Sequence, residues 1–407
     1  MINIERDVIV VGAGPAGSIC AAYLAKAGAD VLLLDKENFP RDKACGDIQR
    51  SGFVSHINEL GAFEQLDKIG TCLRRIRLIS DDGRGVNLPF ECYCTPRAQL
   101  DSMLVDTALK LGVEFRQNCR VTGLVREGGY VKGVTLDSCG TDSRGSGSCG
   151  SGSCGKINEL RSKLVVVADG TYSGLAKELG IMKEKSSAIC LGQRAYFKGV
   201  KLDRKLAADQ YDAYGMFFFD ASVKPCYFWV LPSGEKGVPE GYCNVGMMVY
   251  DRDTYKGMDL QERFYRWREK SPEIKGIFDG AEQVSPWQGG KLTDMTQNMQ
   301  KSGDGFLVVG DAASVMMPMM NDGMSAAADS AGDAAKAAME ALKKDNFSGE
   351  FLSEHYRSGA DVSAEDLKLT RLMMQSMYDP KVMDQIIERL GRDKAYRNRI
   401  ISQLQQG

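Results

Sequence analysis

The chain has 407 residues, more than one ordinary hydrophobic core accommodates, so its length predicts two or three lobes. Hydrophobic residues make up 43% and charged residues 26%, which is typical of a globular protein, and a formal net charge of -2 leaves no basic field to attract nucleic acid. The sequence has neither a run of about 18 apolar residues, as a transmembrane helix needs, nor the basic start and apolar stretch of a signal peptide. We therefore expect a cytoplasmic protein that binds no nucleic acid.

The elements expected along the chain indicate an α/β protein with a second, antiparallel lobe. An apolar strand (Val8 to Val11), a glycine-rich turn, a helix and a second apolar strand (Val31 to Leu34) have the pattern of a βαβ unit. From residue 185 to about residue 284, aromatic-rich strand patterns predict an antiparallel sheet, with one helix near residues 260–270. The chain after Ala326 has helical patterns.

The glycine-rich turn has the spacing of a dinucleotide-binding site. Gly12, Gly14 and Gly17 form G-x-G-x-x-G between two apolar strands. The first glycine permits the tight turn, the second lets the backbone approach a pyrophosphate, and the third lets the helix pack on the strand. Asp35 ends the second strand, at the distance expected of an acid that holds a ribose hydroxyl.

The cysteine and histidine contents argue against disulfides and against a metal site. The twelve cysteines are scattered through expected strands and helices without a secretory signal, which favours reduced thiols. With only His56 and His355 in the chain, we expect no histidine-based metal site and predict no metal. Residues 138–155 form a Gly/Ser/Cys-rich tract that indicates a loop between two strands. A loop that is oxidised or binds a soft metal is the alternative for this tract.

Further strand-end acids favour FAD as the dinucleotide. Gly310-Asp311 follows the apolar strand "FLVV", and in FAD enzymes a Gly-Asp at this place puts a carboxylate on the ribityl hydroxyls. Arg97 has the placing of an arginine that contacts the cofactor in such enzymes, and Asp169 is another acid at a strand end. Each of these residues alone is also compatible with ordinary turn chemistry. Together with the glycine-rich turn they fit FAD better.

The sequence resembles the geranylgeranyl reductase family of FAD proteins, within the larger group of aromatic hydroxylases and flavin-dependent halogenases. The resemblance extends from the N-terminus to about Leu342 and rests on "VVGAGPAGS", "FPRDKACGD", "VVVADG", "YFWVLPSGE" followed by "CNVGM", and "VVGDAA". "YFWVLP" is similar to the aromatic-x-Trp-x-aliphatic/aromatic-Pro signature of these reductases, with Leu231 where Phe is usual. Halogenases carry Trp at the first aromatic position, where this chain has Tyr227.

The resemblance implies which residues lie beside the flavin where the substrate reacts, here called the reacting side. Tyr227 and Trp229 would border the substrate cavity beside the flavin, and a core strand with space-filling aromatics is the alternative. Cys45 would lie near the flavin, where it could tune the flavin or supply a proton, and a small buried thiol is its alternative. Arg41 and Lys43 could steady phosphate or substrate charge, although such residues are more often solvated. We take Cys45, Tyr227 and Trp229 as catalytic candidates.

These patterns also predict the domain boundaries and the cofactor contacts. We expect a discontinuous Rossmann-like FAD-binding lobe (1–174 and 286–345), an antiparallel substrate lobe (175–285) and a C-terminal helical segment (346–407). The predicted FAD-binding residues are Gly12, Gly14, Pro15, Ala16, Gly17, Asp35, Lys36, Ala44, Cys45, Arg97, Gly310, Asp311, Gly323 and Met324.

The chain departs from the family pattern after Gly310-Asp311. The family usually has Asp-Pro and a Thr-Gly-x-Gly type turn there, whereas this chain has Met317 before Pro318 and further methionines around them. We expect a helix from about Gly323, whose N–H groups and positive dipole end would stabilise a reduced, anionic flavin. Some of the methionines from Met316 to Met320 should face an apolar substrate, and core packing is the alternative for each.

We therefore predict an FAD-dependent reductase that saturates carbon–carbon double bonds of an isoprenoid or other apolar compound. An FAD-dependent monooxygenase is the main alternative, a halogenase is disfavoured by Tyr227 and "KACGD", and a redox-sensing module would use Cys139, Cys149 and Cys154. No second G-x-G-x-x-G in a βαβ context is found, so the reductant is either transiently docked NAD(P)H or a small electron carrier.

A C-terminal apolar stripe has helical spacing. Ordinary helix packing is the default interpretation, with peripheral adsorption to a membrane surface or shielding of an apolar channel as alternatives. The stripe consists of Leu369, Leu372, Met373, Met377, Ile386, Ile387 and Leu390.

Overall fold

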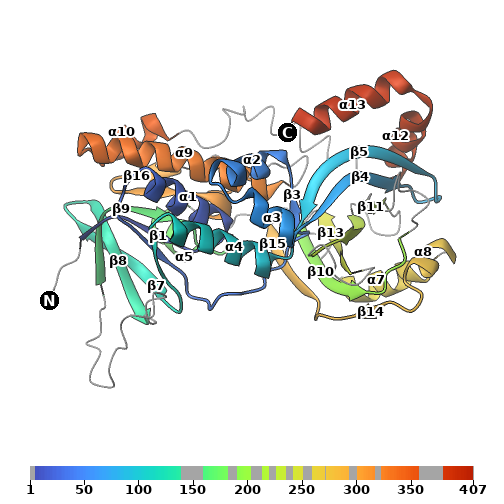
Figure 1. Ribbon diagram of the computed structural model, residues 1–407, viewed down its shortest axis with the longest axis horizontal. Helices are drawn as coiled ribbons and strands as arrows, with labels where there is room; N and C mark the ends of the chain where they lie inside the picture. Colours follow the sequence, from blue (N-terminus) through green and yellow to red (C-terminus); the bar gives the residue numbers. More distant parts are fainter. Residues whose placement is uncertain are drawn as a thin grey trace.

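The computed structural model describes two sheets with helices against each of them (Figure 1). The described residues are 5–138, 159–181, 190–202, 213–219, 226–234, 242–250, 259–270, 272–292, 300–316, 322–356 and 379–406. Apart from Ser138, the loop predicted at 138–155, with its three cysteines, lies outside these ranges, as do the methionines from Met317 to Met320.

The first sheet has the parallel core expected of a dinucleotide-binding lobe. Its strand order is β16-β17-β9-β1-β2-β6, and all pairs from β17 to β6 are parallel. The antiparallel strands β7 and β8 extend it beside β9. The strands are β1 (Glu5–Val11), β2 (Val31–Leu34), β6 (Glu114–Arg116), β7 (Arg120–Glu127), β8 (Tyr130–Ser138), β9 (Glu159–Val167), β16 (Ser302–Gly303) and β17 (Phe306–Val308).

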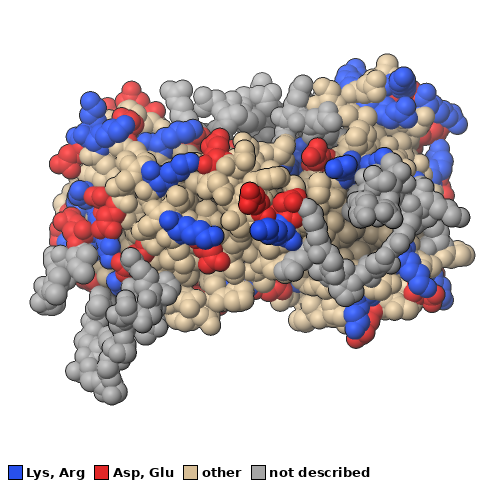
Figure 2. All heavy atoms as spheres, viewed as in Figure 1, with Lys and Arg blue, Asp and Glu red and all other residues tan. Residues whose placement is uncertain are grey.

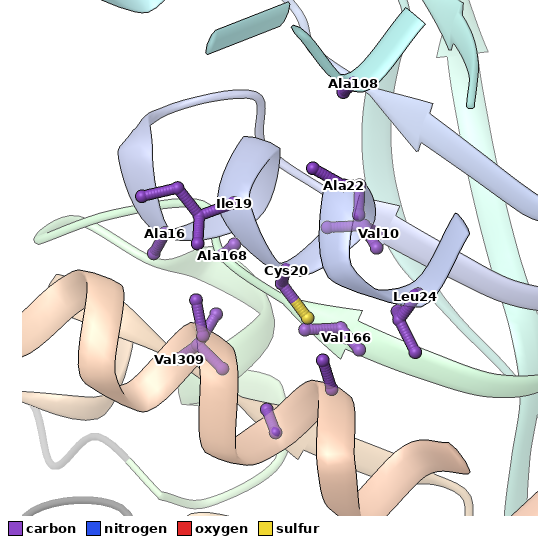
Figure 3. Packing of buried hydrophobic residues seen from close by; sticks show 14 of the residues in the cluster. Val10, Ala16, Ile19, Cys20, Ala22, Leu24, Ala108, Val166, Ala168 and Val309 are labelled. Atoms are coloured by element: carbon purple, nitrogen blue, oxygen red, sulfur yellow. The ribbon is translucent and has the colours of Figure 1, made fainter. Parts of the chain in front are cut away.

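Small side chains allow helices to pack closely on this sheet. Helix α1 (Pro15–Lys26) lies against the long helix α9 (Gly323–Lys344), whose buried positions are mostly alanine. Figure 3 shows Ala16 and Cys20 of α1 near Val166 and Val309 in this contact. Because these side chains are short, the helix backbones can approach each other and the strands. The other helices of this lobe are α2 (Ser51–Glu59), α3 (Phe63–Ile69), α4 (Arg97–Lys110), α5 (Gly174–Glu178) and α10 (Gly349–His355).

The second sheet draws strands from three parts of the chain. Its order is β14-β10-β13-β12-β11-β4-β5-β3, with β15 also paired to β10. The pairs are antiparallel except β11 with β4, which is parallel. The strands are β3 (Ile48–Gln49), β4 (Thr71–Ile79), β5 (Gly85–Cys94), β10 (Cys190–Lys198), β11 (Ala213–Phe219), β12 (Cys226–Pro232), β13 (Cys243–Tyr250), β14 (Glu282–Gln283) and β15 (Gln288–Leu292).

The sheet pairing differs from the expected arrangement in two respects. Strands β3, β4 and β5 lie within the range 1–174 but pair with the second sheet, and β15 does so from beyond residue 285. The sequence patterns identified strands but not their partners, because pairing between distant segments leaves little local signal. The domain ranges themselves stay predictions.

The two faces of the second sheet are covered by different helices. On one face, α7 (Leu260–Arg268) and α8 (Pro272–Ile277) bury Phe228 and neighbouring aromatics. On the other face, α12 (Pro380–Arg392) and α13 (Lys394–Gln406) pack over β5 and complete an apolar cluster that includes Trp229 and Met316. Ile386, Ile387 and Leu390 belong to this cluster, so helix packing is confirmed for the described part of the C-terminal stripe.

Trp267 of α7 should contribute strongly to stability, because its buried ring stacks on Phe228 of the sheet with centroids 4.4 Å apart. Replacing Trp267 by Ala should lower the free energy of unfolding by about 3–5 kcal/mol, measured by urea denaturation. Arg266→Ala is the matched control on the same helix, where the side chain is 78% exposed. If the two substitutions have equal effects, α7 does not contribute to the core as described.

Candidate active site

Two glycines of the G-x-G-x-x-G turn are required by the protein's own packing. Gly12 has a φ of +102°, and a Cβ there would lie 2.3 Å from the carbonyl oxygen of Ala168. A Cβ on Gly17 would lie 1.8 Å from the carbonyl oxygen of Gly12. These contacts join the start of α1 to the ends of β1 and β9, so a side chain at either position would separate the helix from the strands.

Gly14 is different, because nothing in the described protein requires a glycine there. Its φ is -71°, and the nearest atom to an added Cβ is Nη2 of Arg41 at 3.5 Å. It stands at the N-terminus of α1, where no side chain of the described ranges caps the helix and the first turn carries no acidic residue. An open glycine, an uncapped helix N-terminus and a nearby guanidinium fit a bound pyrophosphate.

Asp35 holds the turn from the end of β2. Its Oδ2 accepts a hydrogen bond from the Ala13 amide at 2.7 Å, and its Oδ1 accepts one from the Glu37 amide at 2.9 Å. The carboxylate therefore fixes the loop backbone, and its contact with a ribose stays a prediction. Lys36, also a predicted cofactor residue, is exposed and lies 4.0 Å from Glu37.

Asp311 lies where several segments meet. Gly310–Ala313 form the short 3-10 helix η2, and Asp311 Oδ2 accepts hydrogen bonds from Thr171 Oγ1 at 3.0 Å and Lys43 Nζ at 3.4 Å. Burial would raise the pKa of Asp311, but the Lys43 charge, the Thr171 hydroxyl and the Arg97 charge outweigh it and lower the pKa below its ordinary value. The acid is therefore held ionised, as an acceptor for hydroxyl groups.

Helix α9 begins beside this acid, as predicted. A Cβ on Gly323 would lie 3.9 Å from Asp311 Oδ1 and 3.7 Å from Met316 Cγ. The expectation of free first-turn N–H groups is wrong for one of them, because Asp322 caps the helix by accepting from the Ser325 amide at 2.9 Å. Met324 packs against the core of the first lobe. A role of Met324 beside the cofactor stays a prediction.

Arg97 and Cys45 are neighbours at the start of α4. The Arg97 guanidinium donates to both oxygens of Asp101 at 2.8 Å, and Arg41 Nη1 lies 3.2 Å from the same carboxylate. Burial raises the pKa of the Cys45 thiol, with Arg97 and the Asp47 backbone amide opposing this shift. Cys45 is therefore a neutral thiol near neutral pH, held next to a fixed cation.

Asp169 Oδ1 is a buried oxygen without a hydrogen-bond partner among the described residues, and burial raises the pKa of this acid. Its other oxygen accepts weakly from the Leu175 amide at 3.5 Å. An unpartnered oxygen at the end of β9, next to the glycine-rich turn, is a further feature that fits a bound polar group.

Tyr227 and Trp229 share one face of β12. Side chains alternate along a strand, so Phe228 points to the core under α7 while Tyr227 and Trp229 point to the opposite face. Their rings lie 5.9 Å apart, and Trp229 Nε1 donates to Asn244 Oδ1 at 2.8 Å. Met316, buried in the same cluster, is the one methionine of Met316 to Met320 that the described residues include.

The segment from Arg41 to Asp47 makes more contacts with the elements of the site than the sequence indicated. Besides Arg41, which pairs with Asp101, Asp42 accepts from Arg194 at 2.5 Å and Lys43 pairs with Asp311. For Arg41 and Lys43 the sequence left open a role with phosphate or substrate charge and ordinary solvation; in the structure each contacts a different element of the site. The sequence analysis did not single out Asp47, Arg194, Tyr196 and Asn244, although the Asp of "KACGD" and the Asn of "CNVGM" lie within the motifs of the resemblance.

Among the described residues, no group of His, Cys, Asp and Glu is arranged to hold a metal ion. None of the helices in the described ranges is long and apolar enough to cross a membrane.

Comparison with known proteins identifies the cofactor. A family model described as an FAD binding domain matches residues 5–356. The chain belongs to this family of FAD-binding proteins. The match spans the glycine-rich turn, Arg97 and Asp311, and the open Gly14, the uncapped α1 and the ionised Asp311 fit the same cofactor. The prediction of FAD is thereby confirmed, and the protein is an FAD-dependent oxidoreductase.

Relatives confirm the resemblance to geranylgeranyl reductases. The chain is 29% identical to "Digeranylgeranylglycerophospholipid reductase 2" of Methanopyrus kandleri, over 86% of this chain and 81% of that protein. A geranylgeranyl bacteriochlorophyll reductase-like protein from Thermoplasma acidophilum shares the fold with a TM-score of 0.75 at 20% identity, covering 96% of this chain and 92% of that one. A flavin-dependent brominase also shares it, with a TM-score of 0.70 at 21% identity over 99% of this chain and all of that one (100%). The two structural matches show the α/β fold alone.

Gly14→Ala should separate cofactor binding from folding. Because the added Cβ meets only Arg41, thermal unfolding of the FAD-free protein should hardly change. Affinity for FAD should fall about tenfold or more, roughly 1.4 kcal/mol, measured by fluorescence titration. Gly391→Ala in α12 is the matched control, since a Cβ there meets no atom of the described part of the chain within 4 Å. Equal FAD affinities for the two variants would contradict the assignment of Gly14.

Proposed function

We propose that this protein is a flavin-dependent reductase that saturates carbon–carbon double bonds of an isoprenoid lipid. The observation that carries the proposal is the apolar face formed by Trp229, Tyr227 and Met316, which lies against the FAD-binding lobe and is covered by α12 and α13. The relative from Methanopyrus kandleri is named for a digeranylgeranylglycerophospholipid, a lipid with long isoprenoid chains. An apolar face of aromatic and thioether side chains suits such a chain better than it suits a polar substrate.

The chain's own residues supply binding, orientation and exclusion of water. FAD, when bound and reduced, supplies a hydride to one alkene carbon. Gly14 and Arg41 would hold its pyrophosphate, and Asp311 its ribityl hydroxyls. Tyr227 and Trp229 would position the alkene, and the C-terminal helices would keep water from the reacting carbons.

The second alkene carbon needs a proton, and Cys45 is the group we propose to hold it. Its pKa is raised by burial, so the thiol carries its proton near neutral pH. Arg97 lies beside the sulfur and would stabilise the thiolate left after transfer. Bulk solvent would then return the proton between turnovers.

The reductant, the membrane contact and the cytoplasmic location are further parts of the proposal. Either NAD(P)H or a small electron carrier reduces the flavin, and stopped-flow reduction with each donor tells them apart. A membrane surface would deliver the lipid. Lys and Arg side chains gather over α12 and α13 at the upper right of Figure 2, where residues 380–406 hold six Lys and Arg against three Asp and Glu. Arg389 and Arg392 are 60% and 80% exposed, although each forms an ion pair, with Asp393 and Glu388. Such charges favour an anionic lipid surface.

An anaerobic experiment tests the reductase against the monooxygenase. We expect polyprenyl lipids with isolated double bonds to reoxidise the reduced flavin without oxygen, and their saturated counterparts, used as the control, to leave it reduced. The measurement is the flavin absorbance after rapid mixing. If every substrate requires oxygen for turnover, the monooxygenase is the better assignment. Cys45→Ser should slow the anaerobic reaction about 100-fold or more if Cys45 supplies the proton.

A further inference from the structure

Asp47 is a buried acid in the turn that carries Cys45, and no part of the mechanism above uses it. Its side chain is fully buried, and its backbone has a φ of +63°, which residues other than glycine rarely adopt. The backbone oxygen accepts hydrogen bonds from the Thr95 amide at 3.0 Å and from Gln49 Nε2 at 2.7 Å. The strained backbone is therefore held by a side chain of β3 and by the residue that follows β5, and such strain is retained where the surroundings fix it.

The carboxylate of Asp47 ties this turn to the second sheet. Its Oδ2 accepts from Tyr196 Oη at 2.7 Å, Asn244 Nδ2 at 2.8 Å and Ser233 Oγ at 3.2 Å. These donors come from β10, from β13 and from the residue that follows β12, so one oxygen atom is hydrogen-bonded to three separate parts of the sheet. Its Oδ1 has no hydrogen-bond partner among the described residues.

Asn244 extends the network to both reacting-side candidates. Its Nδ2 also donates to the backbone oxygen of Cys45 at 2.8 Å, and its Oδ1 accepts from Trp229 Nε1 at 2.8 Å. One buried amide thus joins the Cys45 backbone, the Asp47 carboxylate and the Trp229 indole. A change in the position of Asp47 must therefore move Asn244, and with it the groups on either side.

The hydrogen bonds to Asp47 require its Oδ2 only as an acceptor, whether the carboxyl group is ionised or protonated on Oδ1. Burial raises its pKa to about 6, while hydrogen bonds from Asn244 and Tyr196 and the charges of Arg194 and Arg97 oppose this rise. The Arg194 guanidinium lies 4.5 Å from the Tyr196 ring and is neutralised by Asp42. Because Oδ2 needs only lone pairs to accept its three bonds, an amide oxygen in its place could accept them too.

We propose that Asp47 is a positioning residue, which acts with Asn244 to hold the Cys45 thiol and the Trp229 indole in a fixed relation across the two lobes. Its effect on catalysis rests on the reductase proposed above. The network itself does not, because it is a property of the folded protein that can be measured without substrate.

The first test measures how firmly the turn holds Cys45. In the FAD-loaded protein, the rate of Cys45 alkylation by iodoacetamide is followed by peptide mass spectrometry. Asp47→Ala should raise this rate about tenfold or more, as expected when several buried hydrogen bonds are lost. Asp47→Asn should keep it close to wild type, because the amide oxygen restores the acceptor. Glu114→Ala, which removes a buried acid from β6, is the control for general loosening.

Milder substitutions keep the test decisive if Asp47→Ala fails to fold. Tyr196→Phe removes one donor to Asp47, and Trp229→Phe removes one donor to Asn244. Each should raise the alkylation rate by a smaller factor, and combining Tyr196→Phe with Asn244→Ala should add little to Asn244→Ala alone, because both act on one network. Unchanged alkylation in all these variants, or equal damage from Asp47→Asn and Asp47→Ala, would overturn the positioning role.

Substrate turnover then separates this inference from the proposed function. The rate of anaerobic flavin reoxidation at saturating polyprenyl lipid should fall in Asp47→Ala and recover in Asp47→Asn, with FAD affinity unchanged in both. If no lipid reoxidises the wild-type flavin, the reductase assignment fails while the alkylation result still decides the role of Asp47. If the lipid reacts equally fast in Asp47→Ala and wild type, the positioning role in catalysis is wrong.

Discussion

The attachment of residues 41–47 to both lobes is the constraint on which the site depends. Within this short segment, Arg41 reaches α4, Asp42 reaches β10 and Lys43 reaches η2, while Asp47 binds three parts of the second sheet. Charged groups at such contacts are costly to bury without partners, so each pairing also fixes the segment in one position. The cofactor-binding turn and the apolar face are thereby held in fixed positions relative to each other, although their strands belong to different sheets.

Strand alternation then decides which side chains reach the reacting side. In β12, one residue in two faces the aromatic core under α7, and the others face the cluster that α12 and α13 cover. A shift of one residue in the pairing with β13 would exchange Trp229 for Phe228 and remove the indole from Asn244. The hydrogen bond between Trp229 and Asn244 therefore reports the correct register of the sheet as well as the orientation of the ring.

Local patterns in the sequence predict the cofactor-binding elements but not the partners of the strands. The βαβ unit, the Gly12, Gly14 and Gly17 turn and the start of α9 could be predicted, because each depends on residues close together in the chain. The entry of β3 to β5 into the second sheet could not, because strand partners are chosen by distant contacts. Nor could the role of Asp47 be predicted, since three of its donors lie about 150 to 200 residues away and only folding brings them together.

We propose that this FAD enzyme adds two hydrogen atoms across an isolated double bond. Product mass after turnover in heavy water under labelled oxygen gas tests it most directly. Because the flavin hydride and the proton both exchange with solvent before transfer, we expect two deuterium atoms per reacted double bond and no labelled oxygen. A product that gains one labelled oxygen atom and keeps its double bond would contradict the account.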